Sequence, residues 1–307
     1  MSQISLMKKT LAAVIIAPAA LTLTLTTASA QRDFSKVEIK TVPVAGNVHM
    51  LVGAGGNIAV SSGDDGIFMI DDQFAPLTDK IIAAVKGISD KPIRFLLNTH
   101  WHFDHTGGNQ NMVNKTDVTI IASEAVRNTM AVPQELKAFN RKIPASPKEA
   151  LPMVTFRSGT TYHMNGETIR IRKLPNAHTD GDSFVQFERA NVIHTGDTFF
   201  NGFYPFIDVE HGGSVNGMIK AIDEMLRYVN DQTKIIPGHG PLGDKAALIR
   251  FQDMLKTTHS LVLAAKKNGQ GPDQLIHSAA FKAVDEKWGG GFLKAPVWLK
   301  IAFAGST

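Results

Sequence analysis

The feature that most constrains the fold of this chain is a dense group of histidines and one aspartate directly after an apolar segment. The apolar run Ile93 to Leu97 predicts a buried strand, and His-Trp-His-Phe-Asp-His follows it at residues 100–105. A buried polar side chain needs a partner, so an ordinary core accommodates such a group only at high cost. A bound divalent cation would satisfy every member at once. We therefore interpret four residues as metal ligands rather than as a polar loop: His100, His102, Asp104 and His105.

Three further candidates lie close to the ends of later predicted strands. His178 lies in a turn between two strands, Asp197 follows the segment 192–195, and His239 follows the segment 234–236. Ligands in layered α/β folds bind where the loops at strand ends converge. Imidazole nitrogen and carboxylate oxygen suit zinc, and histidine-rich sites that leave a position for water are catalytic. The chain has no cysteine, so thiolate ligands are excluded.

Each of these residues also has a structural interpretation. A single loop histidine is commonly a surface residue, and Asp197 could cap the turn after its strand. Near His178, one of Asp180 and Asp182 is expected to orient a ligand imidazole and the other to shape the turn. His194 is predicted to be packed on a strand. The remaining histidines receive no role: His49, His163, His211, His259 and His277.

In its order and spacing this pattern resembles the metallo-β-lactamase superfamily, whose mark is His-x-His-x-Asp-His followed by a separate His, an Asp and a last His. The resemblance runs from His100 to His239. It implies an α/β fold of the αββα sandwich type, with two mixed sheets covered by helices and two metals at one edge between the sheets. A hydroxide between the two metal ions would be the nucleophile.

The resemblance also implies which residues hold each metal. The first ion would be bound by His100, His102 and His178, and the second by Asp104, His105 and His239, with Asp197 bridging the two. Asp104 is additionally the residue that we predict to be catalytic. Two Zn²⁺ ions are the expected cofactors, with iron or manganese as alternatives. Zinc lowers the pKa of a bound water to roughly 7, which makes a nucleophile available at neutral pH.

Hydrophobic periodicity independently favours an α/β fold, because predicted strands and helices alternate along most of the chain. Short β-branched runs separated by glycines between residues 37 and 70 predict hairpins that begin with a strand at 37–39. Residues 131–152 contain four prolines without a clear period and are predicted to be a surface insertion, which can border a site. Helices are predicted at 77–88, 123–130, 214–229 and 244–265, and further strands at 93–97, 118–121, 168–172, 184–187, 192–195 and 234–236.

Residues 1–30 have the pattern of a secretory signal peptide. Lys8 and Lys9 precede an apolar run, and the segment closes on Ala-Ser-Ala, which predicts cleavage before Gln31. A membrane anchor is the alternative, but threonines interrupt the run and a span needs about 20 predominantly apolar residues. We therefore expect a periplasmic or secreted protein without stable membrane insertion after cleavage. Residues 31–307 are predicted to form one hydrolase domain of undefined oligomeric state.

The formal net charge gives little support to a nucleic-acid partner. It is +4 for the whole chain and becomes +2 (4 − 2) when the two lysines of the leader are removed. Nucleic-acid-binding proteins normally present a clustered basic face, so this small surplus favours a small-molecule substrate.

The resemblance defines the chemistry better than the substrate, because members open β-lactams, lactones, thioesters and phosphodiesters. A β-lactamase is the leading hypothesis, because export would bring the protein to the compartment where cell-wall antibiotics act. Asp197 argues against it, since the main lactamase subclasses have a cysteine or another non-bridging residue at this place. A lactone, ester or thioester hydrolase is therefore the alternative. A di-iron redox protein is a minor one, since such relatives carry a glutamate in place of His102.

Two segments are candidates for substrate contact. The run Phe-Phe-Asn-Gly-Phe-Tyr-Pro-Phe at 199–206 is unusually aromatic and follows Asp197, so it predicts either a pocket wall or core packing. Gly53 to Gly56 predicts a hairpin turn, with a mobile flap over the substrate as a further hypothesis. The side chains that we predict to bind substrate are Trp101, Phe199, Phe203 and Tyr204.

Overall fold

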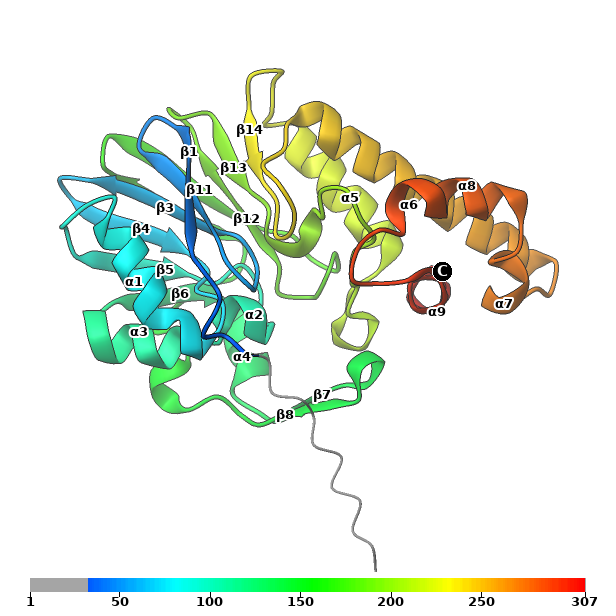
Figure 1. Ribbon diagram of the computed structural model, residues 1–307, viewed down its shortest axis with the longest axis horizontal. Helices are drawn as coiled ribbons and strands as arrows, with labels where there is room; N and C mark the ends of the chain where they lie inside the picture. Colours follow the sequence, from blue (N-terminus) through cyan, green and yellow to red (C-terminus); the bar gives the residue numbers. More distant parts are fainter. Residues whose placement is uncertain (1–32, 307) are drawn as a thin grey trace, which may run out of the picture. The chain divides into compact units, whose positions relative to one another are not determined.

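Two mixed β-sheets pack against each other in the computed structural model, which describes residues 33–306 (Figure 1). The first sheet has seven strands in the order β1-β2-β3-β4-β5-β6-β9. Strands β1 to β4 form antiparallel pairs, and β5, β6 and β9 add in parallel. The strands are β1 (Lys40–Ala45), β2 (Val48–Val52), β3 (Ile58–Gly63), β4 (Gly66–Ile70), β5 (Ile93–Leu97), β6 (Thr119–Ser123) and β9 (Val154–Phe156).

The second sheet has five strands in the order β10-β11-β12-β13-β14. Its first four strands are antiparallel neighbours, and β14 pairs in parallel with β13. The parallel pairs in both sheets place several strand ends at the same edge, where the loops that carry the candidate ligands meet. The strands are β10 (Gly159–Met164), β11 (Glu167–Lys173), β12 (Ser183–Phe187), β13 (Val192–His194) and β14 (Lys234–Ile236).

The core between the sheets follows from the alternation of side chains along each strand. Phe68 and Leu97 of the first sheet join Ile171, Val185 and Phe187 of the second in one buried apolar cluster. Alternate residues of the first sheet point to the opposite face, where they form a separate cluster with α1 and α3. The helices between β4 and β9 along the chain are α1 (Thr78–Lys86), α2 (Phe103–Thr106), α3 (Asn109–Thr116) and α4 (Glu124–Met130).

The outer face of the second sheet is covered by the C-terminal helices. Phe184, Ile193 and Ile235 pack there in a large buried cluster that also contains residues of α5, α6, α8 and α9. Serine or aspartate side chains cap α5, α6 and α8 by accepting hydrogen bonds from first-turn backbone N–H groups. These helices are α5 (Val215–Leu226), α6 (Lys245–Lys267), α7 (Pro272–Leu275), α8 (Ala279–Trp288) and α9 (Ala295–Gly305).

The α/β sandwich with helices outside two mixed sheets confirms the predicted fold class. The first strand begins at Lys40, so the prediction of a strand at 37–39 was wrong by a few residues. Strand β10 was not predicted, because its threonine-rich sequence is half exposed and has little apolar alternation. Residues 131–152 contain a small hairpin of β7 (Gln134–Leu136) and β8 (Arg141–Ile143).

Among the described residues, 34–306 form one compact unit. The predicted signal peptide, residues 1–30, lies outside the described residues. Within residues 33–306, none of the helices is both long enough and apolar enough to cross a membrane.

Candidate metal centre

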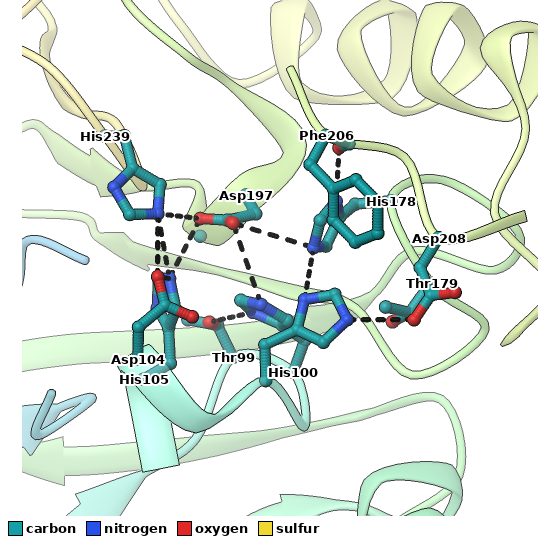
Figure 2. A network of polar contacts seen from close by, with 12 residues as sticks. Thr99, His100, Asp104, His105, His178, Thr179, Asp197, Phe206, Asp208 and His239 are labelled. Atoms are coloured by element: carbon teal, nitrogen blue, oxygen red, sulfur yellow. Dashed lines mark hydrogen bonds and ion pairs between the residues drawn. The ribbon is translucent and has the colours of Figure 1, made fainter. Parts of the chain in front are cut away.

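All seven predicted ligands come together at one edge of the two sheets, and Figure 2 labels six of them, all except His102. His100 and His102 lie in the loop after β5, and α2 begins immediately afterwards, so its first turn carries Asp104 and His105. From the second sheet, His178 lies between β11 and β12, Asp197 lies in the turn η4 (Gly196–Thr198) after β13, and His239 follows β14. Five of the seven are buried, whereas the side chains of Asp104 and His239 remain 24% and 20% exposed.

The donor atoms form two groups that match the predicted metal sites. One group contains His100, His102, His178 and Asp197, and the other contains Asp104, His105 and His239. Within each group the donor atoms lie within 4.8 Å of one another. This compactness is what a metal ion requires of its ligands.

Asp197 lies between the two groups, with one carboxylate oxygen facing each. Its Oδ2 is 3.8 Å from His100 Nε2 and 3.6 Å from His178 Nε2. Its Oδ1 is 3.0 Å from His105 Nε2 and 3.4 Å from His239 Nε2. This is the arrangement expected of a carboxylate that bridges two cations.

The unsatisfied atoms at the centre fit bound cations. Among the described residues, His100 Nε2 and Asp197 Oδ1 are buried without a hydrogen-bond partner. His105 Nε2 and His239 Nε2 face each other at 3.3 Å. Lone pairs of imidazole and carboxylate that converge in this way are costly in a dry interior and are satisfied by a divalent ion such as zinc or iron.

A set of outer hydrogen bonds orients three of the histidines. Asp71 is fully buried after β4 and accepts from His105 Nδ1 at 2.8 Å and from the Thr99 hydroxyl at 2.8 Å. The same hydroxyl lies 3.0 Å from His100 Nδ1, which can donate to it. His178 Nδ1 donates to the Phe206 carbonyl at 2.7 Å. Each ring therefore directs Nε2 toward the centre, as such outer partners do in metal sites.

His102 has the opposite orientation. Its Nδ1 lies 2.8 Å from His178 Nε2, and its Nε2 donates to Asp208 Oδ2 at 2.9 Å. Asp208 also accepts from His211 Nδ1 at 2.8 Å, and His211 Nε2 donates to Gln134 Oε1 of β7 at 3.0 Å. This chain of contacts links the insertion to a candidate ligand.

Asp71, Asp208 and His211 were missed by sequence reasoning. His211 was assigned no role, and Asp208 and Asp71 were not considered. Their contacts join segments that are far apart in sequence, so no local spacing could reveal them. An aspartate at the end of the buried β4 was the one available indication, because a carboxylate in such a place needs a partner.

Asp182 shapes the turn that carries His178. Its carboxylate accepts from the backbone N–H groups of His178 and Thr179 at 2.6 Å and 2.8 Å, and from the Thr179 hydroxyl. Burial raises the pKa of Asp182 to about 8 despite these hydrogen bonds. The backbone N–H of Asp180 donates to the His211 carbonyl at 2.8 Å, and no ligand imidazole contacts its carboxylate within the described chain. His194 is buried on β13, as predicted, and contacts the Asn57 carbonyl at 2.9 Å.

The two groups differ electrostatically in the metal-free chain. Burial lowers the pKa of His178 to about 4 and that of His100 well below its usual value, so both are neutral. Burial also opposes charge on His239, but Asp197 and Asp104 outweigh it and raise the pKa of His239 to about 9. The pKa of His105 is likewise raised by its aspartate neighbours against the effect of burial. The second group therefore holds protons that a metal would displace.

Two glycines allow the loops to approach the centre closely. A Cβ atom at Gly56, in the loop between β2 and β3, would lie 2.0 Å from His105 Cε1. A Cβ atom at Gly238 would lie 2.1 Å from Asp197 Oδ1. The predicted hairpin turn at Gly53–Gly56 is present, and Gln73 fastens it through the Ala54 N–H and the Gly56 carbonyl. The loop thus packs directly on the second group of ligands.

The predicted substrate-contacting residues have very different environments. Phe199 is fully buried against Phe251, and Tyr204 is fully buried against Trp298, so both belong to the hydrophobic core. Trp101 is 3% exposed and packs on His102. Phe203 is only partly buried and keeps surface near the centre.

Several proteins with similar sequences are named as metallo-hydrolases or as hydroxyacylglutathione hydrolases. A probable metallo-hydrolase of Methanocaldococcus jannaschii is 26% identical over 206 residues, which are 66% of this chain and 90% of that protein. A hydroxyacylglutathione hydrolase of Polaromonas is 28% identical over 165 residues, covering 53% of this chain and 55% of that protein. The chain thus spans about half the length of this second relative.

Solved structures and a family profile agree on the fold. A metallo-beta-lactamase from Pontibacter korlensis superposes with a TM-score of 0.58 at 18% identity, covering 71% of this chain and 99% of that chain. The profile of the metallo-beta-lactamase superfamily matches residues 41–239, the segment that contains every residue of the centre. The chain belongs to the metallo-beta-lactamase superfamily.

Proposed function

We propose that this chain is an exported two-zinc hydrolase that opens a small cyclic amide or ester, with a β-lactam as the leading substrate. The observation that carries the two-metal hydrolase is the position of Asp197, whose two oxygens face two compact groups of ligands. The preference for a β-lactam rests instead on the predicted export. The two ions, when bound, would supply Lewis acidity for the substrate carbonyl and lower the pKa of a water molecule to roughly 7.

The protein's own contribution is to position the ligands and shape access to them. Asp71, Thr99 and Asp208 fix ring orientations, so little reorganisation is needed when the centre forms. The partial exposure of Asp104 and His239 leaves one side of the centre open, where a substrate can approach. The buried His100 and His178 form the closed side.

A lactone, ester or thioester hydrolase is the second candidate. Asp197 favours it, because a bridging aspartate is more usual in lactonases and hydroxyacylglutathione hydrolases than in the main lactamase subclasses. The similarity to a hydroxyacylglutathione hydrolase also supports this second candidate. The structural similarity to a metallo-beta-lactamase supports only the shared fold.

The test is hydrolysis by the purified chain from Gln31, loaded with zinc, of three substrates: a chromogenic cephalosporin, a simple lactone and a thioester of a hydroxy acid. Chelator-sensitive opening of the cephalosporin would support the β-lactamase hypothesis, and opening of the lactone or thioester alone would favour the second candidate. His239→Ala should abolish each activity. His163→Ala, which changes an exposed histidine on β10, is the matched control and should retain them. If the zinc-loaded chain hydrolyses none of the three, the proposal is wrong.

Export is a separate part of the proposal and has its own test. It rests on the sequence of residues 1–30. Expression of the full chain in a bacterium should give a periplasmic product whose N-terminus is Gln31. A cytoplasmic product that retains the leader would contradict it.

A further inference from the structure

Two exposed phenylalanines lie near the candidate metal centre, one near each group of ligands. Among the described residues, Phe139 and Phe292 are the only aromatic side chains that are largely exposed, at 45% and 55%. The other large apolar side chains with such exposure are aliphatic. Scattered surface apolar residues need no explanation, but exposed rings gathered beside one polar centre are typical of a binding site.

Phe292 lies beside the second group of ligands. Its ring centroid is 6.4 Å from that of His239 and 6.1 Å from that of Phe203. Phe200 stacks on the His239 ring at 5.1 Å and also approaches Phe292, at 6.3 Å. Phe292 therefore extends an aromatic surface from a partly exposed candidate ligand into solvent.

The loop that carries Phe292 is packed close to this surface. Gly291 precedes it, and a Cβ atom at this glycine would lie 2.5 Å from Phe203 Cβ. The loop lies between α8 and α9, outside the segment that the family profile matches. This part of the site is thus built by residues that the superfamily pattern does not include.

Phe139 lies next to the first group with the Phe206 ring between them. Its ring is 4.8 Å from that of Phe206, and Phe206 contacts the rings of His102 and His178 at 5.6 Å and 5.8 Å. Phe139 lies between the two strands of the β7–β8 hairpin and is the last residue of the turn η2 (Lys137–Phe139).

The hairpin that carries Phe139 is fastened at three points. Gln134 contacts His211, Lys137 pairs with Glu210 at 2.7 Å, and the Arg141 guanidinium lies 3.6 Å from the centroid of the Phe103 ring. These contacts hold the exposed ring at the border of the centre. They place the otherwise unexplained insertion beside the site.

We propose that Phe139 and Phe292 form two apolar subsites, so that the substrate carries apolar groups on both sides of the bond that is cleaved. The inference rests on the proposed hydrolase function and narrows its substrate class to hydrophobic acyl or aryl compounds, such as a cyclic amide or ester with apolar substituents. It disfavours small polar thioesters. An apolar group that contacts either ring gains affinity by removing that surface from water.

Binding of straight-chain carboxylates from acetate to octanoate to the zinc-loaded chain tests this inference without turnover. Complete burial of a methylene gives about a fourfold gain in affinity, so partial burial should give about twofold per methylene. Calorimetry should therefore give a Kd for octanoate at least about tenfold lower than for butyrate. Phe292→Ala and Phe139→Ala combined in one chain should raise the octanoate Kd about threefold or more and leave the acetate Kd unchanged. Each single change should raise it less, because the one alkyl tail can use the other subsite.

Leu263→Ala, which removes an aliphatic side chain of 40% exposure on α6, is the matched control and should leave every Kd unchanged. Octanoate that binds no more tightly than acetate would overturn the inference, as would phenylalanine variants that behave like the control. The carboxylates are not hydrolysed, so a failure in the hydrolysis assays would count against the proposed function and leave this readout intact. Conversely, if the chain hydrolyses lactones but its affinity for carboxylates does not depend on the length of their alkyl chain, the proposed function stands and the two subsites are rejected.

Discussion

The carboxylate of Asp208 accepts a hydrogen bond from Nε2 of His102 at 2.9 Å and thereby makes Nδ1 the nitrogen that faces the other candidate ligands. Asp208 is 2% exposed and lies in the loop before η5 (Val209–His211), more than a hundred residues from His102 in sequence. Its pKa is held well below the usual range, because hydrogen bonds from His102 and His211 outweigh the effect of burial. A permanent anion at this place fixes the tautomer of His102.

Asp208→Asn should weaken metal binding at the first group. The amide keeps the shape of the side chain but loses the charge that orients His102, and loss of such an outer partner typically costs about 10–100-fold in metal affinity. Competition with a chromogenic chelator measures the change. Asp223→Asn, a change on α5 outside the centre, should bind zinc as tightly as the unmodified chain. An unchanged zinc affinity in the Asp208 variant would mean that His102 needs no such partner.

Asp104→Ala should remove a ligand of the second group and abolish turnover while the fold is retained. The side chain is partly exposed and contributes little to the core, so the loss acts on the metal and not on packing. Hydrolysis rates and circular dichroism of the zinc-supplemented variant measure the two properties. A folded variant with nearly unchanged turnover would exclude Asp104 from the catalytic centre.

Metal loading should depend on pH differently in the two groups. The pKa of His239 is about 9 in the metal-free chain, so this group must release a proton to bind zinc below that pH. The pKa of His178 is about 4, so it is already neutral at pH 6. Dialysis against an excess volume of buffer with a low, fixed free zinc concentration should leave about one ion per chain at pH 6 and two at pH 9. Simultaneous loss of both ions as the pH falls would contradict this order.

The raised pKa of His239 also affects the stability of the metal-free chain. A raised pKa in the folded state means that protonated His239 favours folding below its unfolded value of 6.5. This contribution is lost as the pH rises from 6.5 to 9. Denaturant unfolding of the metal-free chain, followed at several pH values within this window, should give a lower stability at the alkaline end. Zinc should remove the dependence, because a bound ion replaces the proton.

Gly56→Ala should displace His105 and reduce binding at the second group. The added methyl group would lie 2.0 Å from the His105 ring. The backbone N–H of Gly56 donates to the Asp104 carbonyl at 3.0 Å, so neither side can move easily. Gly290→Ala is the matched control, since a Cβ atom there meets nothing within 4 Å among the described residues. We expect about half the zinc content in the first variant and full content in the second. Equal zinc contents would show that the loop adapts.

Much of the centre could be predicted from sequence, because its ligands are either close together in sequence or located at the ends of predicted strands. His100, His102, Asp104 and His105 are within six residues, and their spacing alone determines which side chains meet. His239 and Asp197 were candidates because each follows a predicted strand. Their assignment to the same site required the resemblance, since nothing in their surroundings specifies that β13 and β14 are parallel neighbours. Predicted strands such as β5 and β12 coincide with the observed ones, because both are apolar, short and bounded by polar turns.

The remaining features depend on packing that a sequence does not display. Phe199 and Tyr204 could be core or pocket wall from their sequence alone, and only their contacts with Phe251 and Trp298 decide in favour of core. Phe292 lies in a glycine-rich segment far from any motif, so its approach to His239 emerges only from the fold. The helices α7 to α9 were not predicted either, because their segments also lie far from any motif.

The ligands come from both sheets, so an ion bound at the centre would link one half of the chain to the other. Each group takes two residues from the segment 100–105 that follows β5 and one from a loop of the second sheet, and Asp197 adds a further donor from that sheet. Neither half contains enough ligands to hold an ion firmly by itself. In a chain without cysteine, bound metal would thus serve as a removable cross-link, and separation of the sheets would release both ions together.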